Sequence, residues 1–154
     1  MPILKPKLEV PLSSPNLPVP IMFRSAVAPA EGIYPLHQHA WGEFVYSFSG
    51  VMEVKVADHH YLAPPQYGVW LPPQLQHVGL NRYEAHHCSL YVGPQLCSAL
   101  PAAPCAVTLS IVSAPPITGL ATKVSPSASA AWRISAVWRW GGISPSGRLS
   151  ITVT

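Results

Sequence analysis

Proline is distributed along the whole chain, and it limits what the chain can fold into. The 154 residues contain 19 prolines and 10 glycines. Because proline lacks a backbone N–H and clashes with the preceding turn, it breaks helix interiors, and long helices are not expected. The remaining signal is a series of short apolar runs between turn residues, which is typical of β-strands. The sequence therefore predicts an all-β protein.

The predicted strands follow a proline-rich start. Residues 1–20 contain too much proline for a helix and are predicted to form an extended arm. In the later run 51–56, Met52, Val54 and Val56 alternate with polar residues, as in a half-buried strand. About eight such strands at close spacing predict a small antiparallel barrel or sandwich. The runs cover residues 21–28, 32–39, 43–49, 51–56, 61–63, 69–71, 77–80 and 87–92.

Charge divides the chain into unlike segments. Residues 1–110 contain five Lys or Arg and six Asp or Glu, a net charge of −1, whereas residues 111–154 contain four Lys or Arg and no acid, a net charge of +4. We therefore predict a folded domain over residues 21–110. For the basic tail over residues 111–154, which is rich in Ser, Ala, Pro and Trp, the sequence predicts no particular fold. A disordered tail or a shifted reading frame would both explain its composition.

Several classes of protein are excluded by composition. No run approaches the roughly 18 apolar residues of a membrane span, and the start of the chain lacks the apolar core of a signal peptide. The three cysteines, Cys88, Cys97 and Cys105, form no C-x-x-C pair and are expected to be reduced thiols. A soluble, cytoplasmic protein without a membrane partner is expected.

The stretch from His37 to Glu43 carries the clearest chemical signal. On a strand, His37 and His39 point to the same face about 6 to 7 Å apart, so they can chelate one cation. Glu43 lies roughly 13 Å further along a straight strand, and it joins them only if the chain bends, for which Gly42 offers a place. His77 is the histidine nearest to the expected return of the chain. Three histidines and one carboxylate suit Zn, Fe(II), Mn, Ni or Cu rather than Ca or Mg.

These spacings resemble a known family. His37-x-His39-x3-Glu43-x6-Gly50 is similar to the second half of the first cupin motif, and Pro72-x4-His77-x3-Asn81 is similar to the end of the second. Residues 51–54 and 64–72 look more specifically like the N-terminal cupin (arabinose-binding-like) sensor domain of AraC-family transcriptional regulators. The resemblance covers about residues 20–110 and implies a cupin jelly-roll barrel. It maps His37, His39, Glu43 and His77 onto the cupin metal ligands.

The resemblance is not complete. Gly32 precedes His37 by five positions, one fewer than the motif has. Gln74 stands where the second motif usually has glycine.

Other patterns have both a functional and an ordinary structural interpretation. The four candidate ligands are alternatively hydrogen-bonded barrel residues without a metal, although metal binding is favoured. Trp41, Tyr46 and Trp70 are weak candidates for a ligand pocket, since aromatic residues in a small barrel are more often core. The remaining histidines are interpreted as solvated or edge residues, and the Trp-Arg cluster of the tail is interpreted as incidental rather than a nucleic-acid or membrane contact. They are His59, His60, His86 and His87, and Trp132-Arg133 with Trp138-Arg139-Trp140.

The resemblance implies an effector-sensing domain that binds a transition metal or a small molecule. Its occupancy would change the geometry of a homodimer, and DNA would be bound by a helix-turn-helix region. That region needs about 100 residues of amphipathic helices, so we expect a truncated product without sequence-specific DNA binding. The alternative is a stand-alone metal-dependent cupin enzyme, a dioxygenase or isomerase using the same four ligands. A third interpretation is a dimerisation module whose histidines are incidental.

Overall fold

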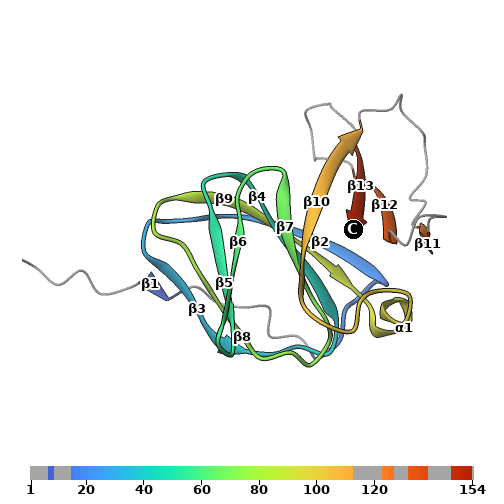
Figure 1. Cartoon of the computed structure of the whole chain (residues 1–154), viewed down its shortest axis with the longest axis horizontal. Coiled ribbons are helices and arrows are strands. Elements are labelled where there is room, and N and C mark those ends of the chain that lie inside the picture. The colour runs from blue at the N-terminus through green and yellow to red at the C-terminus, as the bar shows by residue number, and fades with distance from the viewer. Residues whose placement is uncertain (1–6, 9–14, 113–122, 127–131, 139–146, 154) are drawn as a thin grey trace, which may run out of the picture. The chain divides into compact units, whose positions relative to one another are not determined.

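The chain divides into two compact units. The computed structural model describes residues 7–8, 15–112, 123–126, 132–138 and 147–153 (Figure 1). The first unit covers residues 1–106 and the second residues 107–154. In the first unit the elements are β1 (Lys7–Leu8), β2 (Ile21–Ala28), β3 (Gly32–His37), β4 (Gly42–Ser49), β5 (Met52–Val56), β6 (His59–Ala63), β7 (Tyr67–Leu71), β8 (His77–Leu80), β9 (Ala85–Val92) and the short helix α1 (Pro94–Cys97).

The strands of the first unit belong to two sheets. One sheet has the order β1-β3-β8-β5-β6, and the other contains β7-β4-β9-β2 as neighbours. Neighbouring strands are antiparallel, except that β1 pairs with β3 in parallel. In Figure 1, β2, β4 and β9 lie next to one another in one layer. The prediction of an all-β, antiparallel domain is confirmed, and the predicted strands lie within about two residues of the observed ones.

The core lies between the two sheets. On β5, Met52, Val54 and Val56 are buried as the alternation predicted. They pack against inward side chains of the opposite sheet because alternate residues of a strand share one face. The buried cluster consists of Ala28, Tyr34, Val45, Met52, Val54, Val56, Ala63, Val69, Leu71 and Ala85.

A β-bulge in β3 changes which side chains face this core. Tyr34 pairs with Gly79, but His37 pairs with His77, so β3 uses one more residue than β8 over this stretch. Pro35, which cannot donate to the ladder, lies within the bulge. Without the bulge, Tyr34 and His37 would point to opposite faces. With it, both line the same interior pocket.

Two glycines are required by the geometry around β4. Gly50 has a φ of 73° in the turn after β4, and a Cβ there would approach the Glu84 carbonyl oxygen to 2.5 Å. Gly42 is needed for a different reason. The indole ring of Trp70 packs so tightly against its backbone that a Cβ would meet a ring carbon at 2.0 Å. Gly42 therefore fixes how β4 and β7 fit together at the start of β4.

The second unit consists of strands in its described parts. They are β10 (Cys105–Val112), which begins in the first unit, β11 (Lys123–Pro126), β12 (Trp132–Trp138) and β13 (Gly147–Val153). Their order is β11-β12-β13-β10, and the β11–β12, β12–β13 and β13–β10 pairs are antiparallel.

The predicted segment boundaries of this chain stay predictions. Residues 1–6, 9–14 and large parts of 111–154 lie outside the described residues, and so do the side chains of the Trp-Arg cluster. In the described parts of the chain, no helix has the length and apolar character needed to cross a membrane.

We expect Gly42→Ala to lower the free energy of unfolding by about 2 kcal/mol or more, because Trp70 or the backbone must move. Gly93→Ala is the matched control, since the new methyl group would meet only the flexible end of Gln95. Urea unfolding measures both variants. Equal losses in the two would contradict the assigned role of Gly42.

Candidate metal centre

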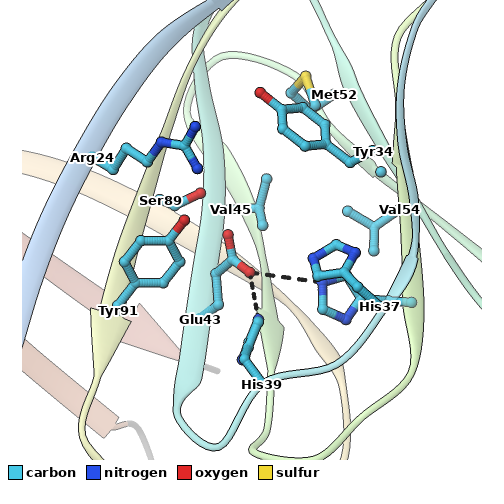
Figure 2. Close-up of a pocket in the computed structure, with 12 residues that line it drawn as sticks. Arg24, Tyr34, His37, His39, Glu43, Val45, Met52, Val54, Ser89 and Tyr91 are labelled. Carbon is cyan, nitrogen blue, oxygen red and sulfur yellow. Dashed lines mark hydrogen bonds and ion pairs between the residues drawn. The ribbon is translucent and has the colours of Figure 1, made fainter. Parts of the chain in front are cut away.

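The four predicted ligands come together from both sheets. His37 ends β3, and His77, its register partner, begins β8 in the same sheet. Between β3 and β4, residues 38–41 carry the chain to the opposite sheet, where Glu43 follows Gly42 at the start of β4. His39 lies in this connection and not on a strand. Figure 2 shows Glu43, His37 and His39 facing one pocket, which His77 also lines.

The side-chain atoms of these residues are close enough to share one ion. His39 Nε2 lies 2.9 Å from Glu43 Oε2, and His77 Nε2 lies 3.7 Å from the same oxygen. One ligand atom from each of His37, His39 and His77 lies within 4.8 Å of the other two. His39, Glu43 and His77 are buried, whereas His37 is partly exposed. The arrangement is therefore a buried cluster that is open on the side of His37.

Each histidine is oriented by a backbone carbonyl two residues away. Nδ1 lies 2.7 Å from Pro35 O in His37, 2.6 Å from Trp41 O in His39 and 2.9 Å from Leu75 O in His77. A carbonyl only accepts, so each Nδ1 donates its proton. With Nδ1 occupied in this way, Nε2 is the ring atom that faces Glu43 from His39 and His77 in the metal-free cluster, and it becomes available to a metal once it carries no proton.

The position of His39 is held from a second loop. The backbone N–H of Gln74 donates to the His39 carbonyl at 2.8 Å. Gln74 has a φ of 64°, in the left-handed region that favours glycine. This is one of the two places at which the sequence departs from the cupin motif. The loop thus keeps the backbone shape that a glycine would allow, at a cost in strain.

The cluster also controls ionisation of its members. Burial acts to raise the pKa of Glu43, but the hydrogen bond from His39 and the charges of His39 and His77 outweigh it and lower the pKa below 4.5. Burial lowers the pKa of His77 below 6.5, although the Glu43 carboxylate opposes this. An ionised carboxylate and a neutral imidazole are the forms that bind a transition metal.

These residues fit a metal ion by the chemistry of their donors. The set offers three imidazole nitrogens and one carboxylate, which suits first-row transition metals. The carbonyl anchors on Nδ1 match the outer contacts that metal-bound histidines have in proteins. The coarse prediction, a His group able to bind a metal, agrees with the structure.

The pocket next to this cluster has a volume of about 40 Å³. The pocket extends from the histidines into the space between the two sheets. A volume of this order holds a few water molecules. Its other lining residues are Arg24, Tyr34, Val45, Met52, Val54, Gly79, Ser89 and Tyr91.

The three aromatic residues predicted as weak pocket candidates do not line this pocket. Trp41 stacks on His39, with ring centroids 5.0 Å apart. Tyr46 packs on Phe48, and Trp70 packs on Phe44 while its Nε1 donates to Pro101 O. Tyr46 is one of the even-numbered residues of β4, which face away from Glu43. All three are buried in the core.

The interpretation of the other histidines needs one correction. His59 and His86 are exposed as predicted, and His60 bonds to Glu53 at 2.8 Å. His87 is buried, because on β9 it has the same inward parity as Ser89 and Tyr91. Its Nε2 lies 3.4 Å from the hydroxyl of Tyr34. The interpretation of His87 as a solvated or edge residue is therefore wrong.

Comparison with known proteins addresses the family. No protein-family model matches the chain. Over 76 residues, 49% of the chain, the sequence is 29% identical to the HTH-type transcriptional regulator NimR of Escherichia coli (strain K12). The predicted resemblance to a transcriptional regulator is confirmed. The chain spans 28% of the length of that relative.

Among the solved structures that are similar to this chain, AerE supports a common fold. AerE from Microcystis aeruginosa superposes with a TM-score of 0.54 at 16% identity, over 92% of this chain and 88% of AerE. A cupin-2 domain protein from Shewanella frigidimarina has a TM-score of 0.44 at 14% identity, covering 47% of this chain and 71% of its own. ToxT from Vibrio cholerae, with an unsaturated fatty acid bound, has a TM-score of 0.43 at 9% identity, covering 55% and 33%. The predicted cupin jelly-roll fold is confirmed.

The ionised Glu43 should stabilise the metal-free protein. Because the folded-state pKa of Glu43 is lowered, this stabilisation is present above its ordinary value of 4.5 and is lost as the pH falls through the folded-state pKa. We expect Glu43→Gln to be less stable than the native chain by about 2 kcal/mol well above pH 4.5. The difference should shrink well below that pH.

Urea unfolding in the presence of a chelator, repeated across this pH range, measures the effect. Glu84→Gln, which changes an exposed carboxylate, is the control. A Glu43→Gln difference that does not change with pH would contradict the assigned ionisation.

Proposed function

We propose that residues 21–110 form the effector-sensing domain of an AraC-type transcriptional regulator. In this proposal His37, His39, Glu43 and His77 hold a transition-metal ion, and the pocket beside it receives a small-molecule effector. The similarity to NimR supports the regulator, and the cupin fold supports the sensor.

One observation carries the metal proposal. Three histidines donate Nδ1–H to backbone carbonyls, and their ligand atoms lie within 4.8 Å of one another beside a buried carboxylate. Three of the four ligands, His39, Glu43 and His77, are buried, and burying such polar groups in a small core is costly unless they are paired or bind an ion. A purely structural role does not require that all three rings donate from Nδ1, nor that their other nitrogens lie close together.

A bound ion would supply Lewis acidity toward an oxygen of the effector. The protein residues do the rest. The carbonyl anchors hold the imidazole rings, and Glu43 lowers the net charge of the site. The apolar side chains of Val45, Met52 and Val54 limit access of water from the core side.

The partners of this domain follow from the proposal. DNA contact belongs to a helix-turn-helix region, and effector occupancy would be read through the geometry of a homodimer. The place of action is the cytoplasm. All three are proposed by analogy with the regulator family.

We expect the purified protein to carry about one transition-metal ion per chain. His39→Ala should lose most of it, because His39 links the ligands of the two sheets. His86→Ala, which removes an exposed histidine of β9, should keep it. Elemental analysis after desalting gives the metal content, and circular dichroism checks that each variant folds.

His77→Gln provides a second test if His39→Ala does not fold, since it keeps the size of the side chain. Metal contents that are equal in the native chain, His39→Ala and His77→Gln would refute the metal site.

A metal-dependent enzyme is the second candidate, and one observation favours it. Tyr34 lines the pocket, and His87 lies behind it at 3.4 Å, so a pair able to move a proton stands inside the barrel. Oxygen uptake by the iron-loaded protein with small diols or diketones tests this function. Turnover that Tyr34→Phe abolishes would support the enzyme, and no turnover with any of them would count against it.

A further inference from the structure

Polar side chains continue through the pocket beyond the proposed metal ligands. Arg24 of β2 pairs in register with Ser89 of β9, and Tyr91, two residues further along β9, pairs with Glu43 of β4. These side chains lie on the inner face of one sheet, and Figure 2 shows Arg24, Ser89 and Tyr91 beside Glu43. Arg24 and Ser89 act to lower the pKa of Tyr91, and Ser89 acts to lower the pKa of Glu43, so these polar groups face one another across the pocket.

The opposite sheet adds one polar group, Tyr34, and His87 of the first sheet lies next to it. Tyr34 enters the pocket because of the bulge in β3. Behind it, His87 is buried, and among the described residues its Nδ1 has no hydrogen-bond partner. A buried imidazole nitrogen without a partner costs free energy. The pocket is therefore more polar than a packed core requires.

The charges in the pocket do not balance once a metal is bound. Among the lining residues, Arg24 is the cation and Glu43 is the carboxylate, so their charges cancel. Histidines that bind a metal are neutral. A divalent ion then leaves a net charge of about +2 in a confined, partly desolvated space.

The size of the pocket limits the ligand. A volume of about 40 Å³ beside the cluster has room for only a few non-hydrogen atoms. Met52, Val54 and Val45 line it on the apolar side. A short alkyl group with an acidic end matches this combination of walls.

We propose that the effector is a small carboxylate, whose negative charge is bound by Arg24 while an oxygen reaches the metal position. The inference rests on the proposed function and specifies its ligand class. Guanidinium binds carboxylate through two parallel hydrogen bonds, so Arg24 selects an acid over the matching neutral amide. Ser89, the register partner of Arg24, and Tyr91 line the same pocket and offer further polar groups to the ligand.

The test is calorimetric titration of the metal-loaded protein with pyruvate and, as neutral partner, pyruvamide. We expect saturable binding of pyruvate and much weaker binding of pyruvamide. Arg24→Gln should weaken pyruvate binding roughly 10- to 100-fold, and Arg24→Lys, which keeps the charge, should weaken it less. Arg82→Gln is the control. It also removes one positive charge, but Arg82 is exposed, pairs with Glu53 and does not line this pocket.

Metal content, measured on the same samples, separates this inference from the proposed metal site. If the native chain holds no metal, the metal site fails, and titration of the metal-free protein still tests Arg24. The carboxylate inference is overturned if pyruvate does not bind the native chain, if Arg24→Gln binds it as well as the native chain, or if pyruvamide binds equally. Circular dichroism checks the fold of Arg24→Gln. If that variant does not fold, Arg24→Lys takes its place, and pyruvate binding as tight as that of the native chain would count against the role of Arg24.

Discussion

The passage of the chain from one sheet to the other within residues 38–41 is the constraint on which the site depends. His37 closes β3 on one side of this connection, and Glu43 opens β4 on the other. Because the two sheets face each other across the core, the change of sheet turns residues near in sequence into opposite walls of one pocket. Gly42 and Trp70 hold the far end of the connection, and Gln74 holds the carbonyl of His39.

Much of the architecture could be predicted from short-range patterns. Proline and glycine limit the elements to short strands, and the alternation of Met52, Val54 and Val56 correctly indicates their inward faces. The four candidate ligands could be named because their spacing repeats a known motif. The chain does bend between His39 and Glu43, as predicted. Gly42 is required there because Trp70 packs closely against its backbone, which the sequence does not reveal.

What could not be predicted depends on register between strands that are distant in sequence. Arg24 belongs to the pocket because β2 pairs with β9, and its register partner Ser89 lies 65 residues later in the chain. Tyr34 belongs to it because of a one-residue bulge, which single-sequence alternation does not reveal. His87 looked like half of an exposed pair, and only its inward parity on β9 separates it from His86.

The distribution of the ligand set over both layers has a mechanical consequence. His37 and His77 belong to one sheet and Glu43 to the other, so an ion held by all of them ties the two sheets together like a cross-brace. Shear or separation of the sheets would then change the coordination geometry. Conversely, a molecule that bound beside such an ion would be coupled through these ligands to the spacing of the two sheets. The metal position would then be the point at which the spacing of the two sheets can be adjusted, next to residues 38–41, where the chain crosses from one sheet to the other.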